Sequence, residues 1–288
     1  MGPGPGPGSG LGSGPRGSWR THGISVEGYR HRREGVPCQD AWAEAATGPE
    51  HARVVVLAVA DGAGSRPQSE VGSALAVRLA TAYFAERIGA TRLFANGSGG
   101  AATDGEAAHA LLGDTFLEVR DEFLRRTGEN GGRPDDFATT LTVVVLAPTW
   151  IGYASVGDGF AILRAGADGG TPLYHLLPQP ESASEYSNET VFLTSREAPR
   201  WIRTECVLDP DADGVLLSTD GLAQAAISWF GGRAVDPNKS FATAVFRSLD
   251  NPGPDPRADE EALAALLRSD RLTALNADDK TLLRAVRT

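Results

Sequence analysis

The chain has 288 residues, enough for one large domain or two small ones, and its contents of 41% apolar and 22% charged residues are ordinary for a soluble globular protein. Its net charge of −10 argues against nucleic acid, a polyanion, as a partner. Two cysteines, and five histidines without metal-ligand spacing, do not support a disulfide framework or a zinc site.

The first 19 residues are nearly all Gly, Pro and Ser, a composition that cannot bury enough apolar surface to offset the entropy lost on ordering. We therefore expect a disordered tail at 1–19 and a folded domain at 20–288. The N-terminus has no apolar stretch of the kind found in secretory signals, and no run approaches the roughly 18 apolar residues of a membrane span. Both observations favour a cytoplasmic protein with no membrane partner.

Strands and one helix are predicted for the first part of the domain. Apolar runs typical of strands lie at 23–26, 41–45 and 54–60. A helix is predicted at 70–87, because apolar residues recur there at four-residue spacing and would form one buried stripe. The stripe consists of Val71, Leu75, Leu79 and Tyr83.

The rest of the chain mixes helices with further strands. A second helix is expected at 106–126, followed by a hairpin of strands 139–147 and 149–156. Further strands are expected at 160–164, 174–177, 215–218 and 281–286, and further helices at 222–230, 240–249 and 259–268. The polar, irregular stretch 178–200 is either a functional flap or an inert surface excursion. Strands in adjacent runs, with helix pairs inserted between them, predict an α+β fold with antiparallel sheets.

Five short aspartate segments, each at the end of a strand-like run, are the most informative feature of the chain. A carboxylate just past the end of a strand points into solvent or a cleft rather than into the core. Five such segments indicate strands that gather acidic oxygens at one rim, an arrangement that suits Mg²⁺ or Mn²⁺. The segments are Gln39-Asp40, Asp61-Gly62-Ala63-Gly64, Gly157-Asp158-Gly159, Asp220-Gly221 and Asp278-Asp279.

Each segment has an ordinary alternative when it is taken alone. The glycines after Asp61 allow close approach of the backbone to a ligand, but the segment is equally a plain strand-to-helix turn. Asp158 and Gly159 lie between two strands, as in a two-residue hairpin turn, and Asp220 is placed to cap a helix. The run 209–214 imitates the start of a calcium loop, but an apolar strand follows where such a loop needs a helix.

Taken together and in order, the segments resemble those of the protein phosphatase 2C family of metal-dependent serine/threonine phosphatases, in its short bacterial form. The resemblance covers about residues 22–287. Each match is weak alone, whereas six in the family's order are strong. The matching runs are Gly-Val-Pro-Cys-Gln-Asp at 35–40, Val-Ala-Asp-Gly-Ala-Gly at 59–64, Ala-Thr-Thr-Leu at 138–141, Ala-Ser-Val-Gly-Asp-Gly at 154–159, Ser-Thr-Asp-Gly-Leu at 218–222 and Asp-Asp-Lys-Thr at 278–281.

The resemblance implies a catalytic domain of two stacked antiparallel β-sheets flanked by α-helices, with a site for two Mn²⁺ or Mg²⁺ ions at one edge. The metal ligands that it implies are Asp61, Gly62, Asp220 and Asp278, with Asp158 at a third, weaker site. Asp61 would bridge the two ions, and the Gly62 carbonyl would bind the first. Asp40 would orient metal-bound water from outside the ligand set.

The implied activity is hydrolysis of phosphoserine and phosphothreonine in phosphorylated protein substrates, which a cognate serine/threonine kinase would supply. Two cations would lower the pKa of a shared water and hold hydroxide in line with phosphorus, so no protein nucleophile is needed. The alternatives are a catalytically silent domain of the same fold that binds a phosphoprotein or regulator, and a phosphatase for small phosphorylated molecules. The complete set of carboxylates counts against the silent domain.

Two departures from the family pattern concern the phosphate and the leaving group. The phosphate-binding arginine of the family lies five residues before the aspartate matched by Asp40, where this chain has Gly35. Arg33 is the favoured substitute among three arginines just upstream. Ala63 stands where eukaryotic members have a histidine thought to protonate the leaving oxygen, and His31 is either its substitute or an ordinary surface histidine.

Two further departures concern the metals. Gln224 replaces an aspartate of the third site, which predicts weaker binding there. Asp279 stands where many members have Asn, and its extra charge either tightens metal binding or caps a turn.

Overall fold

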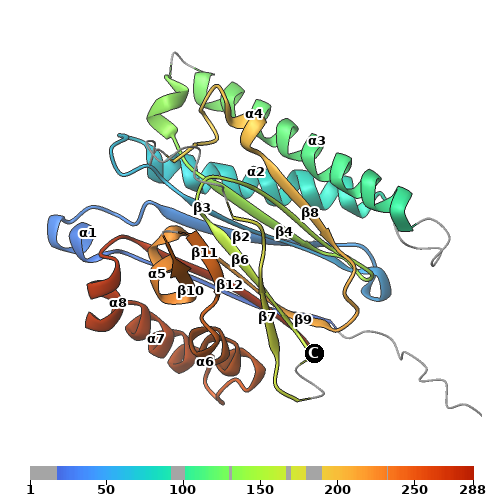
Figure 1. Ribbon diagram of the computed structural model, residues 1–288. Coiled ribbons are helices and arrows are strands. Elements are labelled where there is room, and N and C mark those ends of the chain that lie inside the picture. Colours follow the sequence, from blue (N-terminus) through green and yellow to red (C-terminus); the bar gives the residue numbers. More distant parts are fainter. Residues whose placement is uncertain (1–17, 92–100, 130–131, 167–169, 180–189, 232) are drawn as a thin grey trace, which may run out of the picture.

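Two five-stranded antiparallel sheets lie face to face, and helices cover the outer face of each, in the computed structural model of the chain (Figure 1). The structure describes residues 18–91, 101–129, 132–166, 170–179, 190–231 and 233–288. The predicted α+β fold, two stacked antiparallel sheets flanked by helices, is confirmed. Most of the predicted tail lies outside the described residues, and Trp19, its last residue, already belongs to the first strand.

Both sheets combine strands from distant parts of the chain. The first has the order β2-β3-β4-β5-β8, with strands Asp40–Thr47, Val54–Asp61, Leu141–Leu146, Ile151–Val156 and Arg203–Val207. The second has the order β1-β12-β9-β6-β7, with strands Trp19–Val26, Lys280–Arg287, Ala212–Ser218, Phe160–Ala165 and Leu173–Leu176. A separate hairpin pairs β10 (Ile227–Phe230) with β11 (Arg233–Pro237).

Two long helices cover the first sheet and four shorter ones the second (Figure 1). The long ones are α2 (Ser69–Gly89) and α3 (Ala101–Gly128), and the shorter ones are α5 (Ala223–Ala226), α6 (Lys239–Asp250), α7 (Pro256–Leu267) and α8 (Asp270–Leu275). Short helices α1 (Tyr29–Glu34) and α4 (Ala198–Trp201) lie in connections, as do 3-10 turns at Glu50–Ala52, Pro134–Phe137 and Asp220–Leu222. Among the described residues, no helix combines the length and apolar character needed to cross a bilayer.

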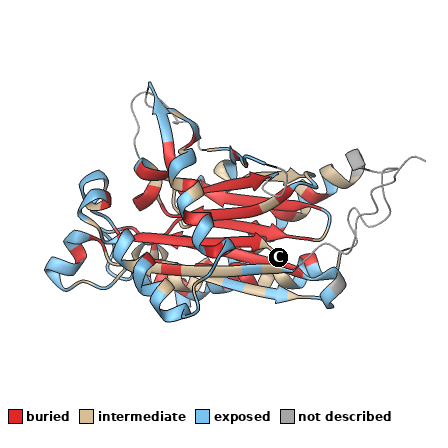
Figure 2. Ribbon diagram, turned by 90° about the horizontal axis from the view of Figure 1, so that it is seen from below, coloured by how far each residue is buried: buried red, intermediate tan, exposed pale blue. Residues whose placement is uncertain are grey.

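Apolar side chains fill three layers, one between the sheets and one between each sheet and its helices. Nearly every residue of β3, β4, β5 and β6 is buried, because these strands are covered on both faces (Figure 2). Phe84 of α2 and Phe116 of α3 anchor the layer above the first sheet, and Tyr153 is buried between the sheets. This packing makes the strand ends a rigid frame for the groups they carry.

The helix predicted at 222–230 is wrong beyond its first turn. The chain forms α5 and then turns into strand β10 at Ile227. Ile227, Trp229 and Phe230 are β-branched or aromatic and favour a strand, and Gly231 takes a φ of 58° in the turn to β11.

The buried face of α2 differs from the predicted stripe at its first residue only. Val71, the first residue of that stripe, is 46% exposed. Leu79 is buried, Leu75 and Tyr83 pack against the core, and the buried face also carries many small residues, including Ser73, Ala76 and Ala80. Small residues let a helix approach a sheet closely, and hydrophobic periodicity gives them little weight.

Gly72 of α2 touches the 3-10 turn before β4 and has no room for a side chain. A Cβ at this position would lie 2.1 Å from the carbonyl oxygen of Phe137. We expect Gly72→Ala to lower the free energy of unfolding by about 1–3 kcal/mol, because the helix or the turn must shift. The matched control is Gly105 of α3, where nothing lies within 4 Å of a Cβ.

Gly105→Ala should raise the free energy of unfolding by up to about 1 kcal/mol, since alanine is the better helix former. Urea denaturation measures both variants. If both substitutions change the free energy of unfolding by the same amount and in the same direction, the close approach at Gly72 is contradicted.

Candidate functional site

Asp40 and Asp61 face each other at one end of the first sheet. β2 begins at Asp40, β3 ends at Asp61, and the antiparallel register pairs their Cα atoms. The Asp61 N–H donates to Thr140 Oγ1 at 3.0 Å, and the Asp61 carbonyl oxygen accepts from Thr139 Oγ1 at 2.8 Å. The run at 138–141, singled out in the sequence, therefore holds the end of β3 in place.

The second sheet carries three more aspartates at its strand ends. Its register pairs Ser218, the last residue of β9, with Phe160, the first residue of β6. Asp220 lies just after Ser218, and Asp158 lies just before Phe160. Both aspartates are therefore at the same edge of the second sheet. Strand β12 starts beside β9, just after Asp278.

Asp61 lies at the centre of this group, and its pKa reports the crowding. Burial raises the pKa of Asp61 well above its ordinary value. The charges of Asp40, Asp220 and Asp158 raise that pKa further. Burial and then the charge of Asp158 raise the pKa of Asp220 to about 6, and Asp278 adds to this effect. The predicted metal carboxylates are therefore within electrostatic reach of one another.

The donor atoms of this group fit a hard divalent cation. The carboxyl groups of Asp61 and Asp220 lie within hydrogen-bonding reach, where a shared proton would offset the repulsion between two ionised acids. Oδ1 of Asp158 is buried without a hydrogen-bond partner. Carboxylate oxygens in such a group are the ligands that Mg²⁺ and Mn²⁺ prefer. Replacing the shared proton by a divalent cation would relieve the repulsion.

The backbone at Gly62 makes a close approach that excludes a side chain. A Cβ on Gly62 would lie 2.7 Å from the carbonyl oxygens of Gln39 and Ser69. The Gly62 N–H donates to the Gln39 carbonyl oxygen at 3.1 Å. Glycine is therefore required where the chain leaves β3, beside the predicted ligand Asp61.

Two threonines with no role in the sequence prediction hold Asp40. Its Oδ2 accepts a hydrogen bond from Thr219 Oγ1 at 2.7 Å, and a hydrogen bond from Thr281 also favours its ionised form. Burial nevertheless raises the pKa of Asp40 to about 8. Thr219 lies in the matching run 218–222 and Thr281 in the run 278–281, which is the signal that could have identified them.

Asp158 lies where the chain crosses between the sheets. β5 belongs to the first sheet and β6 to the second, so the hairpin alternative for Gly157-Asp158-Gly159 is wrong. Gly157 takes a φ of 100° in this crossing. Thr190 Oγ1 donates to Asp158 Oδ2 at 2.7 Å.

Part of the stretch 178–200 lies at the site, because Thr190 contacts Asp158. Residues 180–189 lie outside the described residues. Arg120 of α3 donates to the carbonyl oxygens of Leu193 and Ser195, each at 3.0 Å, and Leu193 is fully buried. Residues 190–200 are thus anchored on α3 rather than extended into solvent.

Helix α1 brings Arg30, rather than the favoured Arg33, to the glycine-rich turn. Nη2 of Arg30 lies 3.3 Å from the point that a Cβ on Gly64 would occupy, and Gln39 Oε1 lies 3.6 Å from the same point. Arg33 is exposed in the last turn of α1. Gly35, at the position of the family arginine, ends the helix with a φ of 67°, a conformation in which a side chain would be strained.

His31 and Asp279 are buried against each other, which overturns the expectation of an ordinary surface histidine. Nδ1 of His31 lies 2.8 Å from Asp279 Oδ1, and the two side chains are only 5% and 3% exposed. Asp279 also accepts hydrogen bonds from two backbone N–H groups. Its carboxylate therefore holds the local backbone, in addition to lying next to the predicted ligand Asp278.

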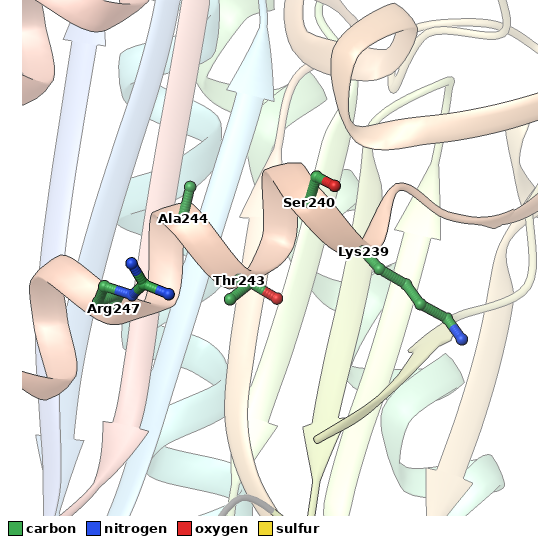
Figure 3. Close-up of a pocket in the computed structure, with 5 residues that line it drawn as sticks. All are labelled: Lys239, Ser240, Thr243, Ala244 and Arg247. Carbon is green, nitrogen blue, oxygen red and sulfur yellow. The ribbon is translucent and has the colours of Figure 1, made fainter. Parts of the chain in front are cut away.

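A shallow depression of about 400 Å³ on the outer face of α6 is chemically unlike this site (Figure 3). Its lining residues are Lys239, Ser240, Thr243, Ala244 and Arg247. They supply no carboxylate, and none of them is a predicted site residue. The aspartate group, and not this depression, therefore has the carboxylates that a divalent cation requires.

The metal-free protein is expected to lose stability as the pH rises. Asp220 and Asp40 have folded-state pKa values of about 6 and about 8, above their ordinary value of 3.8, so the fold retains protons that the unfolded chain has released. The stability linked to these protons is complete below about pH 4 and is lost as the pH passes about 6 and then about 8. Thermal denaturation in EDTA should show a falling Tm across this window.

Asp220→Ala provides the comparison, because it removes one of the two groups and should flatten the lower part of the pH profile. Saturating Mn²⁺ should raise Tm most at the alkaline end, where the carboxylates are ionised. A metal-free Tm that stays level or rises from about pH 5 to about pH 9 would contradict the crowding of these acids.

A sequence model of the family described as Protein phosphatase 2C matches residues 27–268. The chain is 27% identical over 268 residues to Serine/threonine-protein phosphatase 3 of Escherichia coli (strain K12), covering 92% of this chain and 97% of that protein. A serine-threonine phosphatase 2C structure from Toxoplasma gondii superposes with a TM-score of 0.63 at 14% identity, over 95% of this chain and 97% of the other. The S. agalactiae serine/threonine phosphatase gives 0.60 at 15% identity, over 93% and 99%. The chain belongs to the protein phosphatase 2C family.

Proposed function

We propose that this chain removes phosphate from phosphoserine and phosphothreonine in proteins by using divalent cations bound at the aspartate group. Metal-dependent hydrolysis of serine and threonine phosphates is the activity of its family. The observation that carries the proposal is the convergence of Asp61, Asp220 and Asp158 at one edge, where burial and the neighbouring carboxylates raise the pKa values of Asp61 and Asp220. A structural role for so many mutually repelling, partly buried acids is hard to justify energetically.

In this proposal each carboxylate has its own task. The carboxylates of Asp61, Asp220 and Asp278 and the carbonyl oxygen of Gly62 would hold Mn²⁺ or Mg²⁺ ions, with Asp61 as the ligand common to both. When bound, such ions lower the pKa of a water and neutralise charge on the phosphoryl oxygens. Asp158 would hold a third, weaker ion.

Asp40 orients the attacking water in this proposal. Its Oδ2 accepts a hydrogen bond from Thr219, and a carboxylate has further acceptor positions for a hydrogen bond from that water. Because Asp40 is buried and lies opposite Asp61 in the register, its carboxylate has a restricted set of orientations toward the metal ligands. Restricted orientation is what a group that aligns a nucleophile requires.

We infer that Arg30 binds the phosphate, in place of Arg33. A guanidinium can donate two parallel hydrogen bonds to phosphate oxygens, and Arg30 is exposed beside the Asp61–Gly64 turn. The substrates would be phosphoproteins made by a serine/threonine kinase.

Phosphate release from a phosphothreonine peptide tests the proposed function. We expect turnover with Mn²⁺, its loss on addition of EDTA, and its recovery when Mn²⁺ is restored in excess. A chain that binds the phosphopeptide but never releases phosphate under any metal condition would instead support the silent binding domain. Faster turnover of small phosphate esters than of every phosphopeptide would point to the small-molecule alternative.

A further inference from the structure

The buried carboxylate of Asp279 joins helix α1 to the segment before Asp40, next to the predicted metal ligand Asp278. Its Oδ1 accepts from the Gly28 N–H at 2.7 Å and lies 2.8 Å from His31 Nδ1, and its Oδ2 accepts from the Gln39 N–H at 2.6 Å. An ionised carboxylate only accepts hydrogen bonds, so His31 donates from Nδ1. The linker before α1, the helix itself and the segment before Asp40 are therefore held by one side chain.

Helix α1 depends on these contacts for its place. It has only six residues, too few to be stable on their own. Besides the bonds to Asp279, the Tyr29 N–H donates to the Ala277 carbonyl oxygen at 2.8 Å. A Cβ on Gly28 would lie 2.4 Å from that same oxygen, so the helix start is pressed against the segment before Asp278.

His31 and Arg30 are neighbours with opposite surroundings. His31 is 4% exposed and faces Asp279, whereas Arg30 is exposed and reaches the Gly64 turn. Within one helical turn, fixing the direction of the buried side chain fixes the direction of the next one. Gln39, whose N–H is held by Asp279, also carries a buried Oε1 without a hydrogen-bond partner on the Arg30 side.

We propose that His31 and Asp279 are positioning residues that hold α1 so that Arg30 is presented to the phosphate. This inference rests on the proposed function in that Arg30 binds phosphate. The proposal also gives Asp279 a role. A carboxylate can accept all three hydrogen bonds, whereas the NH₂ group of an Asn would face one of the three donors and could not accept its hydrogen bond. His31 then acts through Arg30 and is not itself a proton donor to the leaving group.

A double-mutant cycle with inorganic phosphate as the probe tests the proposal. The Mn²⁺-loaded full chain is titrated with phosphate by calorimetry, for the unmodified protein and for Arg30→Ala, His31→Leu and the double variant. We expect His31→Leu to weaken phosphate binding about tenfold alone, and less than twofold in the Arg30→Ala background. If His31→Leu lowers the phosphate affinity by the same factor in both backgrounds, the proposal is overturned, because His31 would then act independently of Arg30.

Hydrogen exchange in the metal-free chain supplies a readout that does not need catalysis. His31→Leu should speed exchange of the amides at 28–36, while Arg30→Ala should leave them unchanged. His31→Asn keeps a donor near the position of Nδ1 and should restore most of the slow exchange and most of the phosphate affinity. Unchanged exchange in His31→Leu would overturn the proposal.

The matched control is His109→Leu on α3, where Nδ1 contacts Thr204 Oγ1 at 3.1 Å, far in the chain from α1. It should change neither phosphate affinity nor exchange at 28–36. If the unmodified chain binds phosphate but does not turn over a phosphopeptide, the proposed function is contradicted. The double-mutant cycle then still decides whether His31 positions Arg30. Lack of phosphate binding in the unmodified Mn²⁺-loaded chain would overturn both.

Discussion

Replacing Asp61 by alanine is expected to reduce metal-dependent turnover of a phosphopeptide by about a thousandfold or more, equivalent to at least ~4 kcal/mol of transition-state stabilisation. The charges of Asp40, Asp220 and Asp158 all act on Asp61, and in the proposed function its carboxylate would be the ligand common to the ions. Steady-state phosphate release over a range of Mn²⁺ concentrations measures the loss. Raising the Mn²⁺ concentration should not restore the rate.

The same substitution should leave the metal-free fold as stable as before, or more stable. Burial and neighbouring charges raise the pKa of Asp61, which means that its ionised form is unfavourable in the fold. Differential scanning calorimetry in EDTA should therefore give an unchanged or higher Tm. The control Asp211→Ala removes an exposed acid outside the group and should change neither turnover nor Tm appreciably. Retained metal-dependent turnover in Asp61→Ala would contradict the assignment of Asp61.

Replacing Arg30 by alanine is expected to lower kcat/KM for a phosphopeptide by about 10- to 100-fold, in line with ~1.5–3 kcal/mol for hydrogen bonds to a charged group. Arg30→Lys should recover only part of the loss, because an ammonium cannot make the paired contact of a guanidinium. Arg33→Ala is the matched control on the same helix and should stay within about twofold of the unmodified protein, as is usual for an exposed side chain.

The opposite ranking, with Arg33→Ala severely impaired and Arg30→Ala nearly normal, would restore the choice made from the sequence. A fall in the affinity for Mn²⁺ in Arg30→Ala would point to a different role for the residue. Mn²⁺ dependence is therefore measured for both variants alongside kcat and KM.

The edge at which the acids meet could be predicted because it depends on local features. Apolar runs of strand length that end in Asp fix where a carboxylate leaves the core, and this placed Asp61 and Asp220 correctly at the ends of β3 and β9. The order of the segments along the chain then pointed to the family resemblance, which implied a role for each aspartate. Helix α6 also followed its predicted range closely, since its apolar periodicity is strong.

Features that depend on contacts between distant segments could not be predicted. The pattern Gly157-Asp158-Gly159 is the same for a hairpin and for a crossing between sheets, and only the partners of β5 and β6 distinguish the two. His31 carries no local sign of burial, because its partner Asp279 lies 248 positions away. The choice between Arg30 and Arg33 likewise depends on how α1 is held.

The position of Mn²⁺ in crystals soaked with that ion tests the metal centre most directly. We expect an anomalous difference map with two strong peaks about 4 Å apart, both within coordination distance of the Asp61 carboxylate, with Asp220 and Asp278 beside one of them. A saturating soak that leaves no peak near Asp61 would contradict the central claim that these strand-end acids form a site for divalent cations.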